Sequence, residues 1–429
     1  MNRKLRLFAG ISLVTTLIYG VWALRPLNVE GEFGPSPTLP SPNGYDELLK
    51  AHRQILTVST EFERRNKQAV DPLLEIGSPE GKIYPSHVRA QWVEQSKEGF
   101  ETLDRALKMP FQFPVFIPKS EYDSRVEGYH IRFLAKGLTV KSDHQASQGD
   151  HFGAAKTALD AIQLGVNMTH NSTVSDGLNG VACEAYGRRA LTTRIAFLTP
   201  AQASHLAKRL ESINANRPKF SHMLEREKLA HAHEIEVQIK AQLQKPTNPS
   251  EYQTAQDAPS PLTRLALPFA NAITRRQIRA FDESIDEALP YADVAWASRK
   301  VTPPSAEHKE NLLVVKLLGS RFFFEKSATM ANQCQIRLAL HAHKKTTGAY
   351  PQRLEELSPR YMGQVPTDTF AAAPMRYMVN DNRYRLWSVG PDGHDDGGRA
   401  IEDKTKTQSE SRYLVRPDST GDIVANISV

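Results

Sequence analysis

The sequence predicts a mainly α-helical protein with an N-terminal membrane anchor, a body of helical hairpins and a small C-terminal α+β domain. Three observations predict this fold class: an uncharged run near the N-terminus, apolar residues at helical spacing along most of the chain, and a final passage with strand and turn patterns. Because 429 residues are too many for one simple core, we expect two or three domains.

The composition argues for folded domains and against a nucleic-acid partner. Hydrophobic residues make up 40% of the chain, and the net charge of +6 is spread over short basic and acidic alternations. Such alternation is typical of a solvated surface. The sequence contains no RNP, zinc-finger or basic-zipper signature. We therefore expect no nucleic acid among the partners.

The first 26 residues predict a transmembrane anchor or a signal peptide. Arg3, Lys4 and Arg6 precede an uncharged run from Leu7 to Leu24, which just reaches the length of about 17–25 residues that spans a bilayer. The basic residues keep their side in the cytoplasm, so the bulk of the chain is expected outside it. We predict a single-pass protein of the bacterial inner membrane. The alternative is cleavage after Ala23, which gives a secreted or periplasmic protein.

The rest of the chain divides by composition into six further segments. We expect a Pro/Gly/Ser-rich extended stalk, a helical body, a linker, a helical segment, a long helix that leads into an α+β domain, and a polar tail. In the same order, these predictions cover residues 27–43, 44–244, 245–261, 262–304, 305–400 and 401–429.

Within the body, apolar spacing and turn residues predict a series of helices. They are expected over about 43–62, 91–107, 126–148, from 151, 177–197, from 199 and 220–244. The proline-spaced stretch Met109–Pro118 is expected to lie extended across the body, because three prolines exclude a helix. The helix expected over 126–148 is followed by a turn at Gly149-Asp150 and by an alanine-rich second helix. This arrangement resembles one tetratricopeptide-type unit in architecture.

Residue types that often carry chemistry give little signal here. His231 and His233 lie two positions apart on a predicted helix, where they point in directions too different to share one metal ion. We expect a solvated polar face there, and for His341 a hydrogen-bonded role in the core. No serine-nucleophile elbow or phosphate-binding loop is present. We expect no catalytic residues and no organic cofactor.

The two cysteines are expected to be buried free thiols. Cys183 and Cys334 both occur in apolar, helix-like surroundings. A disulfide between them stays open as the alternative, because the sequence does not give their separation.

One acidic loop is a candidate calcium site. Asp392, Asp395 and Asp396 alternate with glycines that permit tight turns, and the backbone of Ser388 is a further candidate oxygen ligand. The spacing is not that of an EF-hand. The alternative is an acidic surface turn whose charges are balanced by Arg376 and Arg399.

The order of motifs in residues 335–398 resembles the globular domain of the G-type pseudopilin of bacterial type II secretion. The corresponding parts are the end of a long helix, a Tyr-Pro turn, a short leucine-rich helix, a Pro-x-Asp-x-Phe loop, two strands and a Ser-x-Gly-x-Asp-Gly loop: Gly348–Pro351, Leu354–Leu357, Pro366–Phe370, Met375–Tyr377, Tyr384–Ser388 and Ser388–Gly393. The resemblance implies a small α+β domain, and in that family the last loop region can hold calcium.

The overall layout differs from a filament subunit and resembles another group. The N-terminus lacks the prepilin-peptidase site of pseudopilins, and a long helical body separates the predicted anchor from the C-terminal domain. Anchor, helical body and pseudopilin-like tail resemble the uncharacterised envelope proteins of planctomycete-type bacteria. We therefore expect a non-enzymatic, membrane-anchored scaffold that binds envelope proteins. The alternative is an exported metal-dependent hydrolase that uses the acidic loop.

Overall fold

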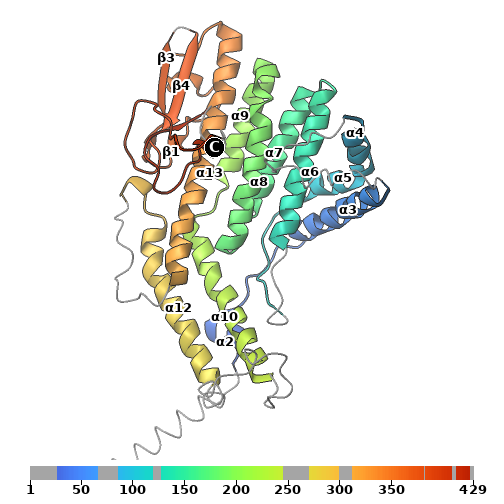
Figure 1. Cartoon of the computed structure of the whole chain (residues 1–429), viewed down its shortest axis with the longest axis vertical. Helices are drawn as coiled ribbons and strands as arrows, with labels where there is room; N and C mark the ends of the chain where they lie inside the picture. Colours follow the sequence, from blue (N-terminus) through green and yellow to red (C-terminus); the bar gives the residue numbers. More distant parts are fainter. Residues whose placement is uncertain are drawn as a thin grey trace, which may run out of the picture.

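The computed structural model describes residues 27–65, 86–118, 127–244, 270–298, 312–380, 382–407 and 412–425. Within these ranges the chain forms eleven α-helices and a small region of short strands near the C-terminus (Figure 1). The mainly helical fold class with a small C-terminal sheet is therefore confirmed. The predicted anchor (1–26) and linker (245–261) lie outside the described residues.

The body is a row of helices packed side by side (Figure 1). Helices α3, α4 and α5 lie at one end of the row, α6 to α9 follow, and α13 lies between α9 and the sheet. In chain order their bounds are Gly44–Arg65, Ser86–Gln95, Lys97–Ala106, Glu127–Ser147, His151–Asn167, Val174–Thr192, Pro200–Ala215 and Leu312–Thr347. The sequence Thr199-Pro200-Ala201-Gln202 is typical of a helix start with a capping threonine. The structure confirms this cap, since the side chains of Thr199 and Gln202 form a capping box at the start of α9.

A second group of helices extends downward from this row in Figure 1. Helices α10 (Phe220–Gln244) and α12 (Ala270–Ala292) pack against each other, and α12 also packs against α13. The short helix α2 (Val29–Phe33) packs on α10. We call α2, α10, α12 and the first half of α13 the base of the molecule.

The segment after the predicted anchor differs from the extended stalk that we predicted. Val29 in α2 is buried, and Glu32 accepts two hydrogen bonds from Arg275 of α12, at 2.6 Å from Nε and 2.8 Å from Nη2. A bidentate pair of this kind fixes both partners in orientation. The composition of residues 27–43 did not reveal this contact, because the partner lies far along the chain.

The proline-spaced stretch Met109–Pro118 lies extended, as predicted, and joins the row to the base. Phe111 and Phe113 are buried beside Tyr45 of α3. Further along, Val115 packs against the apolar cluster between α2, α10 and α12.

Within its described residues, the C-terminal domain contains the short 3-10 helix Leu354–Leu357 and two small antiparallel sheets. The larger sheet has the order β3-β4-β5, with Tyr377 opposite Leu386 and Trp387 opposite Val424. The other sheet pairs β1 with β2. The bounds of β1 to β5 are Thr367–Asp368, Ala373–Pro374, Arg376–Asn380, Arg383–Ser388 and Ile423–Val424.

Two boundaries differ from the sequence predictions. The helix predicted over 91–107 is two helices with a break at Ser96. Residues 401–429, predicted as a polar tail, include strand β5, and Ile401, Val415 and Ile423 are buried. Sparse apolar residues in a polar stretch gave no strand pattern, so β5 was missed.

Helix α13 belongs to both the body and the C-terminal domain. Its second half contributes Leu338 and Ala342 to a core that also contains residues of α7, α8 and α9 and of the C-terminal domain. None of the helices in the described ranges combines the length and the hydropathy of a membrane span.

Helices α7 and α8 approach closely because glycines face each other. A Cβ atom added at Gly180 would lie 2.4 Å from the carbonyl oxygen of Gly165, which is closer than real contacts allow. In contrast, Gly319 on the exposed side of α13 has nothing within 4 Å of such an atom.

We therefore predict opposite effects of two alanine substitutions in helices. Gly180→Ala should lower the free energy of unfolding by about 1–3 kcal/mol, because the helices must separate. Gly319→Ala should raise it by roughly 0.5–1 kcal/mol, because alanine loses less backbone entropy in a helix. Thermal or urea unfolding of the full chain measures both, and equal effects of the two substitutions would contradict the close packing of α7 on α8.

Candidate functional site

The acidic loop predicted as a calcium site is held by internal hydrogen bonds. Asp392 accepts from the backbone N–H groups of His394 at 3.1 Å and Gly421 at 2.9 Å. Its carboxylate thus ties the loop to the chain just before β5.

Asp395 points to a different part of the domain. Its Oδ2 accepts from Nε of Arg376 at 2.8 Å, and its Oδ1 accepts from the indole N–H of Trp387 at 2.9 Å. The hydrogen bonds from Trp387, Gly397 and Arg376 hold the pKa of Asp395 below its usual range. The alternative role predicted for Arg376, as an internal partner of the loop, is confirmed.

Asp396 is the third predicted ligand, and it lies beside a buried acid that the sequence analysis did not single out. Asp396 is 3.7 Å from Nη2 of Arg399, and its N–H is 3.3 Å from Oδ1 of Asp422. The other oxygen of Asp422 accepts from the N–H of Gly398 at 2.7 Å. Burial and the charges of Asp395 and Asp396 raise the pKa of Asp422 to about 6.

Ser388, whose backbone was a further candidate ligand, is the last residue of β4. Its hydroxyl donates to Oδ1 of buried Asp368 at 2.7 Å, and the N–H of Val389 donates to Oδ2 of the same residue at 2.9 Å. Asp368 therefore fixes the end of β4 where the acidic loop begins.

The three predicted ligands thus share one loop but contact different parts of the domain. Across the described ranges, no set of three or more His, Cys, Asp or Glu side chains is arranged to hold a metal ion. The oxygens of Asp392 and Asp395 already accept hydrogen bonds from N–H groups, and Arg376 and Arg399 balance part of the charge of Asp395 and Asp396. Calcium binding at this loop stays a prediction.

The paired histidines lie on packed helix faces. The ring centre of His231 lies 4.1 Å from that of Phe281 at an interplanar angle of 35°, and burial lowers the pKa of His231. His233 is buried, which differs from the solvated face that we predicted, because α10 packs on α2 and α12 through this side. Nε2 of His341 lies 2.9 Å from the carbonyl oxygen of Leu198, which confirms its hydrogen-bonded role in the core.

Both cysteines are buried free thiols, as predicted. Burial raises the pKa of the Cys183 thiol. A protonated thiol in an apolar environment is a poor nucleophile.

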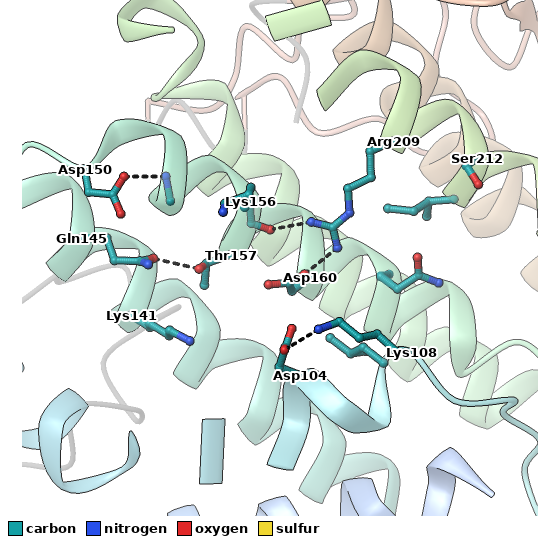
Figure 2. Close-up of a pocket in the computed structure, with 14 residues that line it drawn as sticks. Asp104, Lys108, Lys141, Gln145, Asp150, Lys156, Thr157, Asp160, Arg209 and Ser212 are labelled. Atoms are coloured by element: carbon teal, nitrogen blue, oxygen red, sulfur yellow. Dashed lines mark hydrogen bonds and ion pairs between the residues drawn. The ribbon is translucent and has the colours of Figure 1, made fainter. Parts of the chain in front are cut away.

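The sequence analysis missed a cavity between α5, α6, α7 and α9 (Figure 2). Its volume is about 650 Å³, within the range of pockets that hold small molecules. The side chains that line it are mostly polar or charged, with Leu107 and Ile213 as the large apolar exceptions. We call this cavity the α6–α7 pocket.

Seven of its lining side chains are charged. Four are cationic and three are carboxylates: Lys108, Lys141, Lys156 and Arg209, with Asp104, Asp150 and Asp160. They come from four helices and from the two turns that hold Lys108 and Asp150. Spacing along the chain gives no signal for such a site; only the shared helix face of Lys141 and Gln145, and that of Lys156 and Asp160, could have suggested it.

Comparison with protein-family models, with curated proteins and with solved structures finds no match to this chain.

The buried carboxylate of Asp422 predicts a pH dependence of stability. Its pKa in the folded state, about 6, lies above that of an unfolded aspartate, about 3.9, so the ionised form is disfavoured by folding. The contribution of the protonated Asp422 carboxyl to the free energy of unfolding is therefore fully present below pH ~4. It is lost as the pH rises through ~6. We expect the free energy of unfolding to fall by about 1–2 kcal/mol over this interval from this group.

Urea unfolding between pH 4 and 7 measures this effect by comparison with Asp422→Asn, in which the fall should be smaller by this amount. Asp282, whose pKa is also raised to about 6, still contributes to the fall in both proteins. The exposed Asp418→Asn is the control and should keep the wild-type profile. Identical pH profiles for wild type and Asp422→Asn would show that this carboxyl does not titrate as described.

Proposed function

We propose that the protein is a non-enzymatic scaffold of the bacterial cell envelope, anchored in the inner membrane by residues 7–24 with its bulk outside the cytoplasm. Its body is a tetratricopeptide-like array of helical hairpins, and its C-terminal domain is pseudopilin-like. Envelope proteins are its expected partners, as in an assembly related to type II secretion.

One observation carries this proposal: α13 is shared by three apolar clusters. Val314 and Leu317 pack in the base, Phe322 packs beside Phe370 of the C-terminal domain, and Leu338 packs in the body core. A single helix that supplies side chains to three clusters restricts motion between them, because each cluster is close-packed. Fixed spacing between surfaces is the physical property that a scaffold needs.

The attachment of α2 supports the placement relative to the membrane. The predicted anchor ends at Leu24, and α2 begins at Val29 and is bound to Arg275 through Glu32. A few residues span at most about 3.3–3.6 Å each. The base would therefore lie next to the bilayer, with the row of helices and the C-terminal domain farther out.

The geometry of the acidic loop argues against the alternative function, a metal-dependent hydrolase. A metal-dependent hydrolase needs ligands that converge on one ion and leave an open position. Asp392, Asp395 and Asp396 instead accept or balance separate internal donors. We keep calcium at this loop as a structural proposal, in which the ion would relieve repulsion among the carboxylates.

Topology and turnover together test the proposed function. A reporter that is active only in the periplasm, fused after Val429, should be active, since basic residues precede the predicted anchor. Purified full-length protein should hydrolyse no peptide, ester or glycan substrate, with or without calcium.

Two outcomes would contradict the proposal. Activity of a cytoplasmic reporter at the same fusion point would overturn the localisation. Metal-dependent turnover that is lost in Asp395→Ala and kept in Asp418→Ala, the control for a carboxylate outside the loop, would favour the hydrolase.

A further inference from the structure

Two of the four cationic side chains that line the α6–α7 pocket form ion pairs with its carboxylates, and two do not. Lys108 is 2.6 Å from Asp104, and Nη2 of Arg209 is 2.5 Å from Asp160. The third carboxylate, Asp150, caps α7 and accepts from the N–H of Gly153 at 2.8 Å. All three acids therefore already have donors.

The other two cations of the pocket, Lys141 and Lys156, form no ion pair with a carboxylate of the described residues. Each ammonium group lies over an aromatic ring. Lys141 is 4.9 Å from the ring centre of Phe100, and Lys156 is 5.0 Å from that of Phe152. Ring contacts of this kind attract a cation through the negative face of the ring, but they supply no net negative charge to pair with it.

The environment of Lys141 is partly desolvated. Burial lowers its pKa, and the more distant Asp160, Asp104 and Glu101 oppose this effect without reversing it. A cation in such a position gains from any anion that reaches it, since attraction is stronger where water is excluded.

Neutral hydrogen-bonding groups lie next to these lysines. Figure 2 shows Lys141 directed from α6 toward Thr157 and Asp160 of α7, with Gln145 one turn farther along α6. The Thr157 hydroxyl donates to Oε1 of Gln145 at 2.8 Å, so the Gln145 amide N–H₂ group stays available as a donor. The seven charged side chains of the lining favour a hydrophilic ligand over a hydrophobic one.

We propose that the α6–α7 pocket binds a small hydrophilic anion, whose carboxylate or phosphate group lies against Lys141 and Lys156 and whose hydroxyl or amide groups reach Gln145 and Thr157. The Arg209–Asp160 pair also lines the pocket, with Nη1 of Arg209 3.4 Å from the carbonyl oxygen of Lys156, and offers both a donor and an acceptor to such groups. The proposal does not depend on the scaffold function, because a ligand site of this kind could serve an anchored or a soluble protein.

Isothermal titration of the full-length protein in a neutral detergent tests the site, with citrate and inorganic phosphate as separate probes at low ionic strength. We expect one-to-one binding of at least one probe. Binding of citrate alone identifies a carboxylate site, binding of phosphate alone a phosphate site, and both outcomes support the proposal. Added sodium chloride should weaken binding, because the contact is ionic.

Three variants locate the anion. Lys141→Gln should raise Kd roughly ten- to hundredfold, as expected for loss of a charge-assisted contact. Asp104→Asn should lower Kd, because it releases Lys108 from its ion pair. Lys136→Gln is the matched control: Lys136 is on the same helix and lies over the Tyr186 ring, but does not line the pocket.

Lys141→Gln and Asp104→Asn should change Kd in opposite directions. A folding defect would instead weaken binding in both variants, so the two explanations can be distinguished. Binding of neither probe would overturn the proposal. Binding that Lys141→Gln and Lys136→Gln weaken equally, or not at all, would place the anion elsewhere and overturn it as well.

Discussion

The buried carboxylate of Glu184 is the contact on which the helical body depends most. It accepts two hydrogen bonds from Arg217, at 2.8 and 2.6 Å, one from Arg188 at 3.2 Å and one from the hydroxyl of Ser327 at 2.9 Å. Burial alone would raise the pKa of Glu184, but the two arginines hold it below its usual range. Ionic groups remain ionised in an interior only when they are paired in this way.

This cluster joins three elements that are distant in sequence. Glu184 and Arg188 belong to α8, Arg217 follows α9, and Ser327 lies in the middle of α13. Because the donors come from different elements, α8 and α13 must lie in one register for all four hydrogen bonds to form. The close contact of Gly165 and Gly180 then sets the distance of α7, and α7 forms one wall of the α6–α7 pocket.

Local patterns were sufficient to predict much of the fold. Apolar spacing predicted most helices, Thr199 and Gln202 predicted a cap, and the prolines of 109–118 predicted an extended segment. These features depend on neighbours within a few residues. Strand β5 was missed, because a tertiary contact decides it: Val424 pairs with Trp387. The break at Ser96 was missed as well, and the local sequence around it gave no signal for it.

The candidate site could be predicted less well for the same reason. The acidic loop was visible as a run of aspartates, but their hydrogen bonds to Gly421 and Trp387, and the buried Asp422 beside them, depend on the fold. The α6–α7 pocket gave no local signal, since Asp104, Lys141, Lys156 and Arg209 lie on four helices. Only the packing of those helices reveals which lysines are already balanced by an acid.

Hydrogen–deuterium exchange of the full-length chain and its Glu184→Gln variant tests the central claim, that one buried cluster couples the body to α13. The variant leaves buried arginine charge uncompensated, so we expect the free energy of unfolding to fall by about 3–5 kcal/mol. Exchange should accelerate together in α8 and in α13 around Ser327. Asp286→Asn, which breaks the exposed pair with Lys228, should cost less than about 1 kcal/mol. Acceleration confined to α8, with unchanged exchange in α13, would contradict the account.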